Sequence, residues 1–174
     1  MEIELERTFL LKYKPEGLEK CPRCELTDIY FPIDEFHPVL RLRSRDGKKF
    51  EMTKKFPISG VDSSEQEEHT IILSKKEFNA LAQAPGKKVV KTRYYYTTPD
   101  GQKAEVDIFK DRLKGLAMVD FEFDDRTKKD TFKMPDFCLA DVVQDKWLAG
   151  GILSGKKYSD LEKAFKKYNY KKIL

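Results

Sequence analysis

Pairs of like charges two residues apart recur along this chain of 174 residues and point to a site that binds ions. Acidic pairs stand at Glu4 and Glu6, at Glu105 and Asp107, and at Asp120 and Glu122, while basic pairs stand at Arg41 and Arg43 and at Lys91 and Arg93. In a β-strand, residues i and i+2 lie on the same face. Adjacent like charges destabilise a strand unless an opposite charge lies between them. A closed sheet with these faces turned inward would hold carboxylates and cations in one lumen, which suits a polyanion bound together with a divalent metal ion.

The alternative is that each charged face is simply solvated while helices cover the apolar face. For any single strand this interpretation is favoured, because half-buried strands normally alternate in this way. The set as a whole favours the lumen, because acidic pairs occupy some strands and basic pairs occupy others.

Eight strands are predicted, and they cover roughly residues 2–12, 26–32, 38–45, 48–56, 66–73, 88–97, 102–110 and 116–124. Asp46-Gly47 and Pro99-Asp100-Gly101 mark two tight turns, and strands joined so closely must pair antiparallel. About eight strands can close into a barrel without exposed edges. The expected fold is therefore α+β, mainly β, built on an eight-stranded antiparallel β-barrel.

Three helices are predicted beside the barrel. Ser74 and Glu77 form a capping box at the start of the first. The second spans about 136–149, where apolar residues recur at helical spacing, and Gly150-Gly151 ends it. The third starts at Ser159 and lies near the C-terminus.

Bulk properties limit the class of protein. The length predicts a single domain over 1–174, with polar loops at 59–67 and 124–134. The net charge of +4 combines abundant residues of both signs, which argues against a protein that coats nucleic acid. No apolar run approaches the ~20 residues of a membrane span, and the N-terminus has no signal-peptide pattern. The odd cysteine count of three argues against a disulfide framework, so a cytoplasmic protein is expected.

In its ordered motifs the chain resembles the CYTH domain family, also called the triphosphate tunnel metalloenzymes. The matching segments are Glu4-Leu5-Glu6 with Phe9-Leu10, Tyr30, Arg41-Leu42-Arg43, Thr53-Lys54-Lys55, Glu68-His69-Thr70, Lys91 to Tyr94, Val106 to Phe109, and Gly115-Leu116 with Asp120-Phe121-Glu122. Each motif is short, but together they follow the family order along nearly the whole chain. The resemblance implies an eight-stranded tunnel, with peripheral and C-terminal helices, that binds a linear triphosphate.

The resemblance also implies roles for individual residues. Cations of the tunnel would bind phosphate oxygens, namely Arg41, Arg43, Lys55, Lys91 and Arg93. Carboxylates would hold Mg²⁺ or Mn²⁺, which prefer oxygen ligands, and these are Glu4, Glu6, Asp120 and Glu122. In thiamine-triphosphatase-like members a Lys–Tyr pair assists catalysis, and Lys91 and Tyr30 match it.

The implied activity is metal-dependent hydrolysis of inorganic tripolyphosphate, thiamine triphosphate or a nucleoside triphosphate, with release of the terminal phosphate. The partner would be this small molecule, with no nucleic acid and no membrane, and the protein would be a monomer or a homodimer. A class IV adenylate cyclase, which makes cyclic AMP and pyrophosphate, is the alternative within the fold.

Three positions depart from the family pattern. Thr8 replaces a lysine, Thr70 replaces a glutamate found in many members, and Asp120 is one methylene shorter than the usual glutamate. The two threonines motivate a third hypothesis, a polyphosphate-binding module without catalysis.

Cys21 and Cys24 form a single CxxC pair. Because a zinc site normally needs four ligands, these cysteines are interpreted as reduced loop residues.

Overall fold

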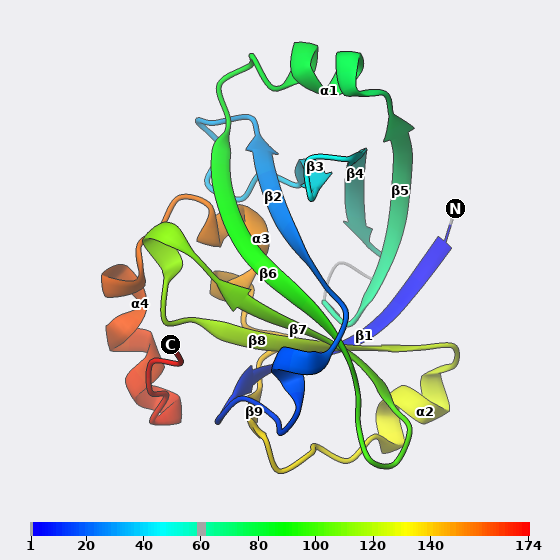
Figure 1. The fold of residues 1–174 in the computed structure, drawn as a ribbon, viewed down its shortest axis with the longest axis vertical. Coiled ribbons are helices and arrows are strands. Elements are labelled where there is room, and N and C mark those ends of the chain that lie inside the picture. The colour runs from blue at the N-terminus through cyan, green and yellow to red at the C-terminus, as the bar shows by residue number, and fades with distance from the viewer. Residues whose placement is uncertain (1, 59–61) are drawn as a thin grey trace.

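The computed structural model describes residues 2–58 and 62–174. The strands are β1 Glu2–Leu11, β2 Arg23–Phe31, β3 Leu40–Arg45, β4 Lys49–Pro57, β5 Glu65–Leu73, β6 Lys87–Thr97, β7 Lys103–Phe109, β8 Ala117–Phe123 and β9 Cys138–Asp141 (Figure 1). The helices are α1 Lys75–Leu81, α2 Arg126–Thr131, α3 Gly150–Leu153 and α4 Tyr158–Phe165, with short 3-10 turns η1 Leu18–Lys20, η2 Asp111–Leu113, η3 Lys146–Leu148 and η4 Lys166–Tyr168. No helix in this part of the chain is long and apolar enough to cross a membrane.

Eight of the strands close into an antiparallel barrel, as predicted. Their order is β5-β4-β3-β2-β6-β7-β8-β1, and β1 returns to pair with β5. This closing contact joins Glu2–Leu5 to Glu65–Glu68. Beyond it, β1 pairs with β8 on one side and with the short strand β9 on the other. All nine strands thus belong to one sheet, wrapped around a lumen.

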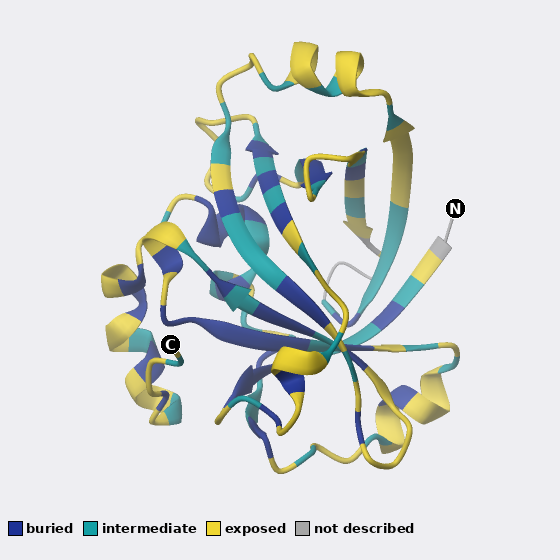
Figure 2. Cartoon of the chain, in the orientation of Figure 1, coloured by how far each residue is buried: buried dark blue, intermediate teal, exposed yellow. Residues whose placement is uncertain are grey.

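The interior of the barrel changes from charged to apolar along its axis. At one end the inward side chains are Leu10, Val89, Phe109 and Met118, and they pack with Leu148 and Leu153 from the segment after β9. Apolar burial of this kind stabilises the fold and fills that end of the barrel. Figure 2 shows by contrast that α1 is exposed, and this helix has no buried residue.

The predicted helix over 136–149 is wrong. Cys138–Asp141 instead forms β9 along the edge of β1 that β5 leaves uncovered. Extended backbone there satisfies hydrogen-bonding groups that the end of β1 would otherwise leave unpaired. Asp141 also accepts a hydrogen bond from Arg7 at 2.7 Å, which ties β9 to β1 through side chains.

The predicted helix stop at Gly150-Gly151 is wrong as well, because these residues begin α3. Glycine is needed at both positions because neighbouring residues lie too close for a side chain, and not because a helix ends there. A Cβ at Gly150 would overlap the hydroxyl of Tyr30, and a Cβ at Gly151 would overlap the carbonyl of Pro38. The two glycines therefore let α3 lie directly against β2 and the loop that follows it.

The other predictions of local structure fared better. The capping box at Ser74 and Glu77 is present. The C-terminal helix begins at Tyr158, where Asp160 accepts from the Lys157 amide at 2.8 Å. The predicted loop over 124–134 contains α2, which Asp125 caps. Of the predicted loop over 59–67, residues 59–61 lie outside the described residues and residues 65–67 belong to β5.

Candidate active site in the barrel lumen

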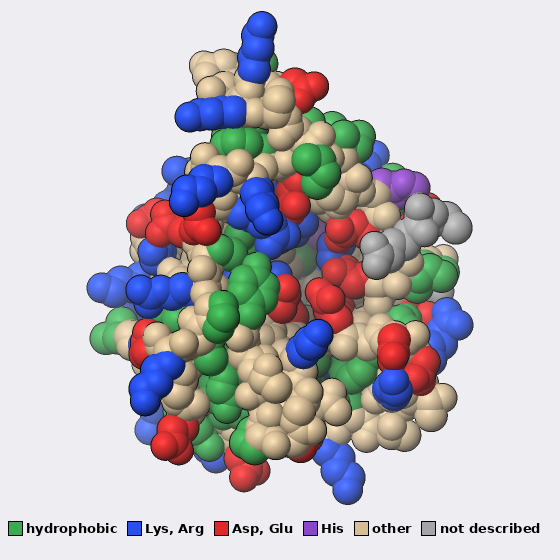
Figure 3. Space-filling view, turned by 45° about the vertical axis from the view of Figure 1, so that its right-hand side comes forward, with side chains coloured by type: hydrophobic (Ala, Val, Ile, Leu, Met, Phe, Trp, Pro, Cys, Tyr) green, Lys and Arg blue, Asp and Glu red, His purple; other side chains and the backbone are tan. Residues whose placement is uncertain are grey.

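The lumen is a cavity of about 590 Å³ lined by charged side chains from every barrel strand. Figure 3 shows acidic and basic side chains gathered around a hollow in the surface. The ten residues predicted for the site all line it, namely Glu4, Glu6, Tyr30, Arg41, Arg43, Lys55, Lys91, Arg93, Asp120 and Glu122. Strand alternation brings them together, because each occupies an inward position of its strand.

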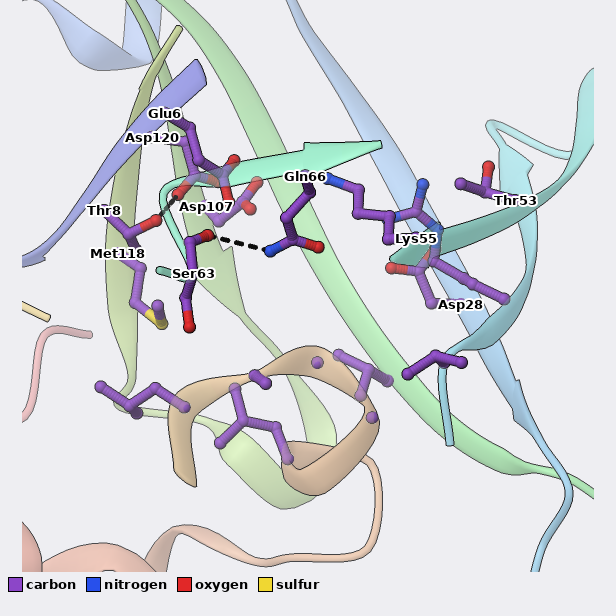
Figure 4. Close-up of a pocket in the computed structure, with 18 of the residues that line it drawn as sticks. Glu6, Thr8, Asp28, Thr53, Lys55, Ser63, Gln66, Asp107, Met118 and Asp120 are labelled. Atoms are coloured by element: carbon purple, nitrogen blue, oxygen red, sulfur yellow. Dashed lines mark hydrogen bonds between the residues drawn. The ribbon is translucent and has the colours of Figure 1, made fainter. Parts of the chain in front are cut away.

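Acidic residues from β1 and β8 face each other across one strand pair. Glu6 lies opposite Glu122, and Thr8 lies opposite Asp120 in the register. The Thr8 hydroxyl donates a hydrogen bond to Asp120 at 2.8 Å, so Thr8 supports a carboxylate where the family pattern places a cation (Figure 4).

These carboxylates hold their protons more tightly than usual. Burial raises the pKa of Glu6 to about 8, and the charges of Asp120, Glu4 and Glu122 add to this effect against Lys55. Burial likewise raises the pKa values of Asp120 and Glu122. Burial is the largest cause of these shifts and the neighbouring carboxylates add to it, so a cation bound among them would lower the pKa values again.

Several lumen residues were missed as site residues in the sequence. They are Asp28, Arg45, Glu51, Glu68, Glu105 and Asp107. Glu105 and Asp107 are spaced two residues apart on one strand, as are the acidic pairs that were predicted as site residues. This spacing alone does not show which cation each carboxylate contacts. Asp28 has no like-charged neighbour at that spacing and gives no such signal.

Two arginines are locked by buried carboxylates. Arg43 donates to both oxygens of Asp28 at 2.6 and 2.8 Å, and the two residues are only 3% and 1% exposed. Arg93 donates to both oxygens of Asp107 at 2.7 and 2.6 Å. Burial would raise the pKa of Asp28, but Arg43 outweighs it and lowers that pKa below its ordinary value.

The two lumen lysines are paired as well. Lys55 bridges Glu4 and Glu68, with 3.3 Å to the latter. Lys91 pairs with Asp107. Burial lowers the pKa of Lys91, and this pairing with Asp107 opposes the shift.

Arg41 differs from the other lumen cations. Within residues 2–58 and 62–174 it forms no ion pair, and its buried Nε atom has no hydrogen-bond partner. An unsatisfied buried donor is costly, so Arg41 is the lumen side chain most in need of an anionic ligand.

Tyr30 and Lys91 line the same cavity but are not joined by a hydrogen bond in the described structure. The Tyr30 hydroxyl lies against Gly150, whereas the Lys91 amine lies against Asp107. Burial raises the pKa of Tyr30, so its hydroxyl stays protonated. The catalytic Lys–Tyr pair therefore stays a prediction.

The donor set fits a hydrated hard cation better than a closed metal cage. Among the residues that the structure describes, no group of three or more His, Cys, Asp or Glu is arranged to hold a metal ion directly. Carboxylate oxygens are nevertheless the donors that Mg²⁺ and Mn²⁺ prefer, and Mg²⁺ usually keeps several waters and takes one or two carboxylates. Glu6 and Glu122, which lie opposite each other and whose pKa values burial raises, are the pair that would hold such a cation.

Comparison with known proteins agrees with this architecture. The model of the CYTH domain family matches residues 2–134. An inorganic triphosphatase of Nitrosomonas europaea is 31% identical over 144 residues, which cover 82% of this chain and 91% of that protein. A crystal structure of an inorganic triphosphatase has a TM-score of 0.64 and 28% identity, covering 88% of this chain and 95% of the other. A structure from Bacillus halodurans, with 14% identity over 99% of this chain and 93% of its own, shares the fold at a TM-score of 0.53. The chain belongs to the CYTH domain family.

Proposed function

We propose that this protein is a metal-dependent hydrolase of triphosphate compounds that releases the terminal phosphate. The observation that carries the proposal is Arg41, a lumen guanidinium with a buried unpartnered nitrogen and no carboxylate partner among the described residues. Guanidinium groups bind phosphate oxygens with two parallel hydrogen bonds. The similarity to a protein named as an inorganic triphosphatase supports inorganic tripolyphosphate as the first substrate to test. Thiamine triphosphate and nucleoside triphosphates are the next substrates to test.

The charge of the lumen supports the metal requirement. Eleven carboxylates but only seven lysines and arginines stand among the described residues that line it. With all of them ionised the lining carries four excess negative charges, so a triphosphate alone would be repelled. Two divalent cations would cancel that excess. Glu4, Glu6, Asp120 and Glu122 would hold them, and bound Mg²⁺ or Mn²⁺ would offset phosphoryl charge and orient the attacking water.

The chain's own residues position the substrate. Arg41 binds phosphate oxygens directly, while Arg43 and Arg93 are held rigid by Asp28 and Asp107 and present fixed positive charge. Water attacks the terminal phosphorus in line, the new P–O bond forms as the anhydride P–O bond breaks, and inorganic tripolyphosphate yields phosphate and pyrophosphate. Such reactions depend mainly on positioning and electrostatic stabilisation. Lys91 donates a hydrogen bond to the leaving oxygen.

The first test is phosphate release from inorganic tripolyphosphate with Mg²⁺ or Mn²⁺, repeated with excess chelator. We expect turnover that chelator abolishes. Cyclic AMP and pyrophosphate formed from ATP, without phosphate release, would identify a cyclase instead. Binding of tripolyphosphate without turnover would identify a binding module.

Arg41→Ala tests the role of the unpartnered guanidinium. Because Arg41 has no carboxylate partner among the described residues, its removal should not lower the unfolding midpoint, while KM rises by about tenfold or more, as expected for a lost charge-assisted bond of ~1.5–3 kcal/mol. Arg23→Ala is the matched control, since Arg23 is largely exposed and does not line the lumen. An unchanged KM in Arg41→Ala would contradict the assignment.

A further inference from the structure

Tyr30 lies beside Arg41, the lumen cation that has no carboxylate partner among the described residues. The register of β2 and β3 places the two residues directly opposite each other, and both line the cavity. Side chains of such a cross-strand pair lie within contact distance. Burial, the largest effect, raises the pKa of the Tyr30 hydroxyl, whereas the charge and hydrogen bonding of Arg41 act to lower it, as expected for a guanidinium next to that hydroxyl.

The Tyr30 side chain has little room to move away from Arg41 toward α3. It is only 9% exposed. Gly150 lies against its hydroxyl, and a Cβ at that position would come within 2.8 Å of the ring carbon that carries the hydroxyl. Packing against α3 therefore holds the phenol ring in place.

On its other side, Arg41 lies opposite Thr53 of β4. The Thr53 hydroxyl already shares a hydrogen bond of 2.8 Å with the hydroxyl of Thr70. A guanidinium can only donate hydrogen bonds, whereas the oxygen of a tyrosine can accept them. Of its two cross-strand neighbours, Tyr30 is therefore the one better suited to fix the Arg41 head group, and the remaining N–H groups of Arg41 stay available to a ligand.

Lys91 is less well placed to act with Tyr30. In the register with β2 it lies opposite Leu26, which is four residues from Tyr30 and so about 13 Å away along the strand. The Lys91 amine pairs with Asp107 and lies 5.4 Å from the centre of the Phe109 ring. The geometry thus favours Arg41 over Lys91 as the residue through which Tyr30 acts.

We propose that Tyr30 is a positioning residue that holds the guanidinium of Arg41 ready to bind phosphate oxygens. Fixing a long side chain before the ligand arrives lowers the entropic cost of binding, because the ligand no longer has to order it. The expected effect on substrate affinity rests on the proposed function. The fixing of Arg41 in the ligand-free protein does not.

NMR relaxation of the arginine Nε–H groups tests whether Arg41 is fixed in the ligand-free protein. The Arg41 signal is identified by its loss in Arg41→Ala. We expect an order parameter near ~0.85 in the unaltered protein and below about 0.6 in Tyr30→Phe, which keeps the ring but loses the oxygen. An Arg41 that is already mobile in the unaltered protein, or equally rigid in Tyr30→Phe, would overturn the proposal.

Tyr94→Phe is the matched control for this measurement. Tyr94 is also buried, at 7% exposed, and its hydroxyl accepts a hydrogen bond from Arg23 at 3.3 Å, but it does not line the lumen. Its substitution should leave the Arg41 order parameter unchanged.

A double-mutant cycle on tripolyphosphate tests the consequence for the site. Tyr30→Phe should raise KM by about two- to tenfold and leave kcat within about twofold of its original value. In an Arg41→Ala background the same change should add nothing, because Tyr30 acts through Arg41. A large fall in kcat, or a further rise in KM when Arg41 is absent, would contradict the proposal and support a catalytic role for Tyr30.

These measurements separate failure of the inference from failure of the proposed activity. If the unaltered protein binds tripolyphosphate without turnover, the proposed activity fails, and the same cycle is measured from the Kd of tripolyphosphate with Mg²⁺. The order parameter of Arg41 tests the positioning role in either case.

Discussion

At the scale of single residues, Asp28 and Arg43 form a buried, doubly hydrogen-bonded ion pair in the lumen. Asp28→Asn would leave the Arg43 charge buried without its partner. Loss of one member of such a pair typically costs about 3–5 kcal/mol. We therefore expect a large drop in the urea midpoint of unfolding. Adding Arg43→Met should recover most of it, because two well-packed neutral side chains replace the ion pair. A midpoint unchanged in Asp28→Asn would contradict this account.

The same pair shows what sequence can and cannot reveal about a residue. Arg41 and Arg43 look equivalent in the chain, since both face inward on β3. Only the register, which places Asp28 opposite Arg43, separates a guanidinium locked by a carboxylate from one that has no carboxylate partner among the described residues. Membership of the lumen follows from strand alternation and could be predicted. The choice of partner depends on how strands far apart in sequence align, and no local pattern encodes it.

At the scale of elements, the contact between α3 and β2 depends on Gly150. Gly150→Ala would force its Cβ onto the Tyr30 hydroxyl. Overpacking of this kind costs about 1–3 kcal/mol, so the urea midpoint should fall. Gly155→Ala is the matched control, because its Cβ would meet only ordinary contacts of 3.6 Å or more. Tyr30→Phe should restore part of the loss in Gly150→Ala, and no restoration would place the strain elsewhere.

The eight barrel strands were predictable because alternation along each is a local property. The structure of the segment after Asp136 could not be predicted in the same way. Its apolar residues satisfy helical spacing, yet the open edge of β1 selects an extended strand. That edge is open because β5 stops pairing with β1 at Leu5. Where this pairing stops is decided by the tertiary structure and cannot be predicted from the local sequence. The glycines were noticed for their helix-ending tendency, whereas their packing against Tyr30 and Pro38 appears only in the fold.

At the scale of the whole molecule, excess negative charge in the lumen makes stability depend on pH. Burial raises the pKa of Glu6 from 4.5 to about 8. Between those values the folded chain binds more protons than the unfolded chain, so stability falls as pH rises through that window. We expect Tm of the metal-free protein to decrease from about pH 5 to about pH 8. Glu6→Gln should flatten that decrease, and a constant or rising Tm would contradict the charge balance described here.

The apolar end of the barrel limits how small molecules can enter and leave the lumen. Leu10, Phe109 and Met118 pack against Leu153 there, and the orange coil below the charged side chains in Figure 4 belongs to the segment containing α3. Among the described residues, these apolar side chains fill one end of the lumen, so we expect a substrate to enter and its products to leave from the charged side. Under the proposed function, a linear polyphosphate would enter end first, and the filled end would limit how many phosphate units reach the acidic side chains.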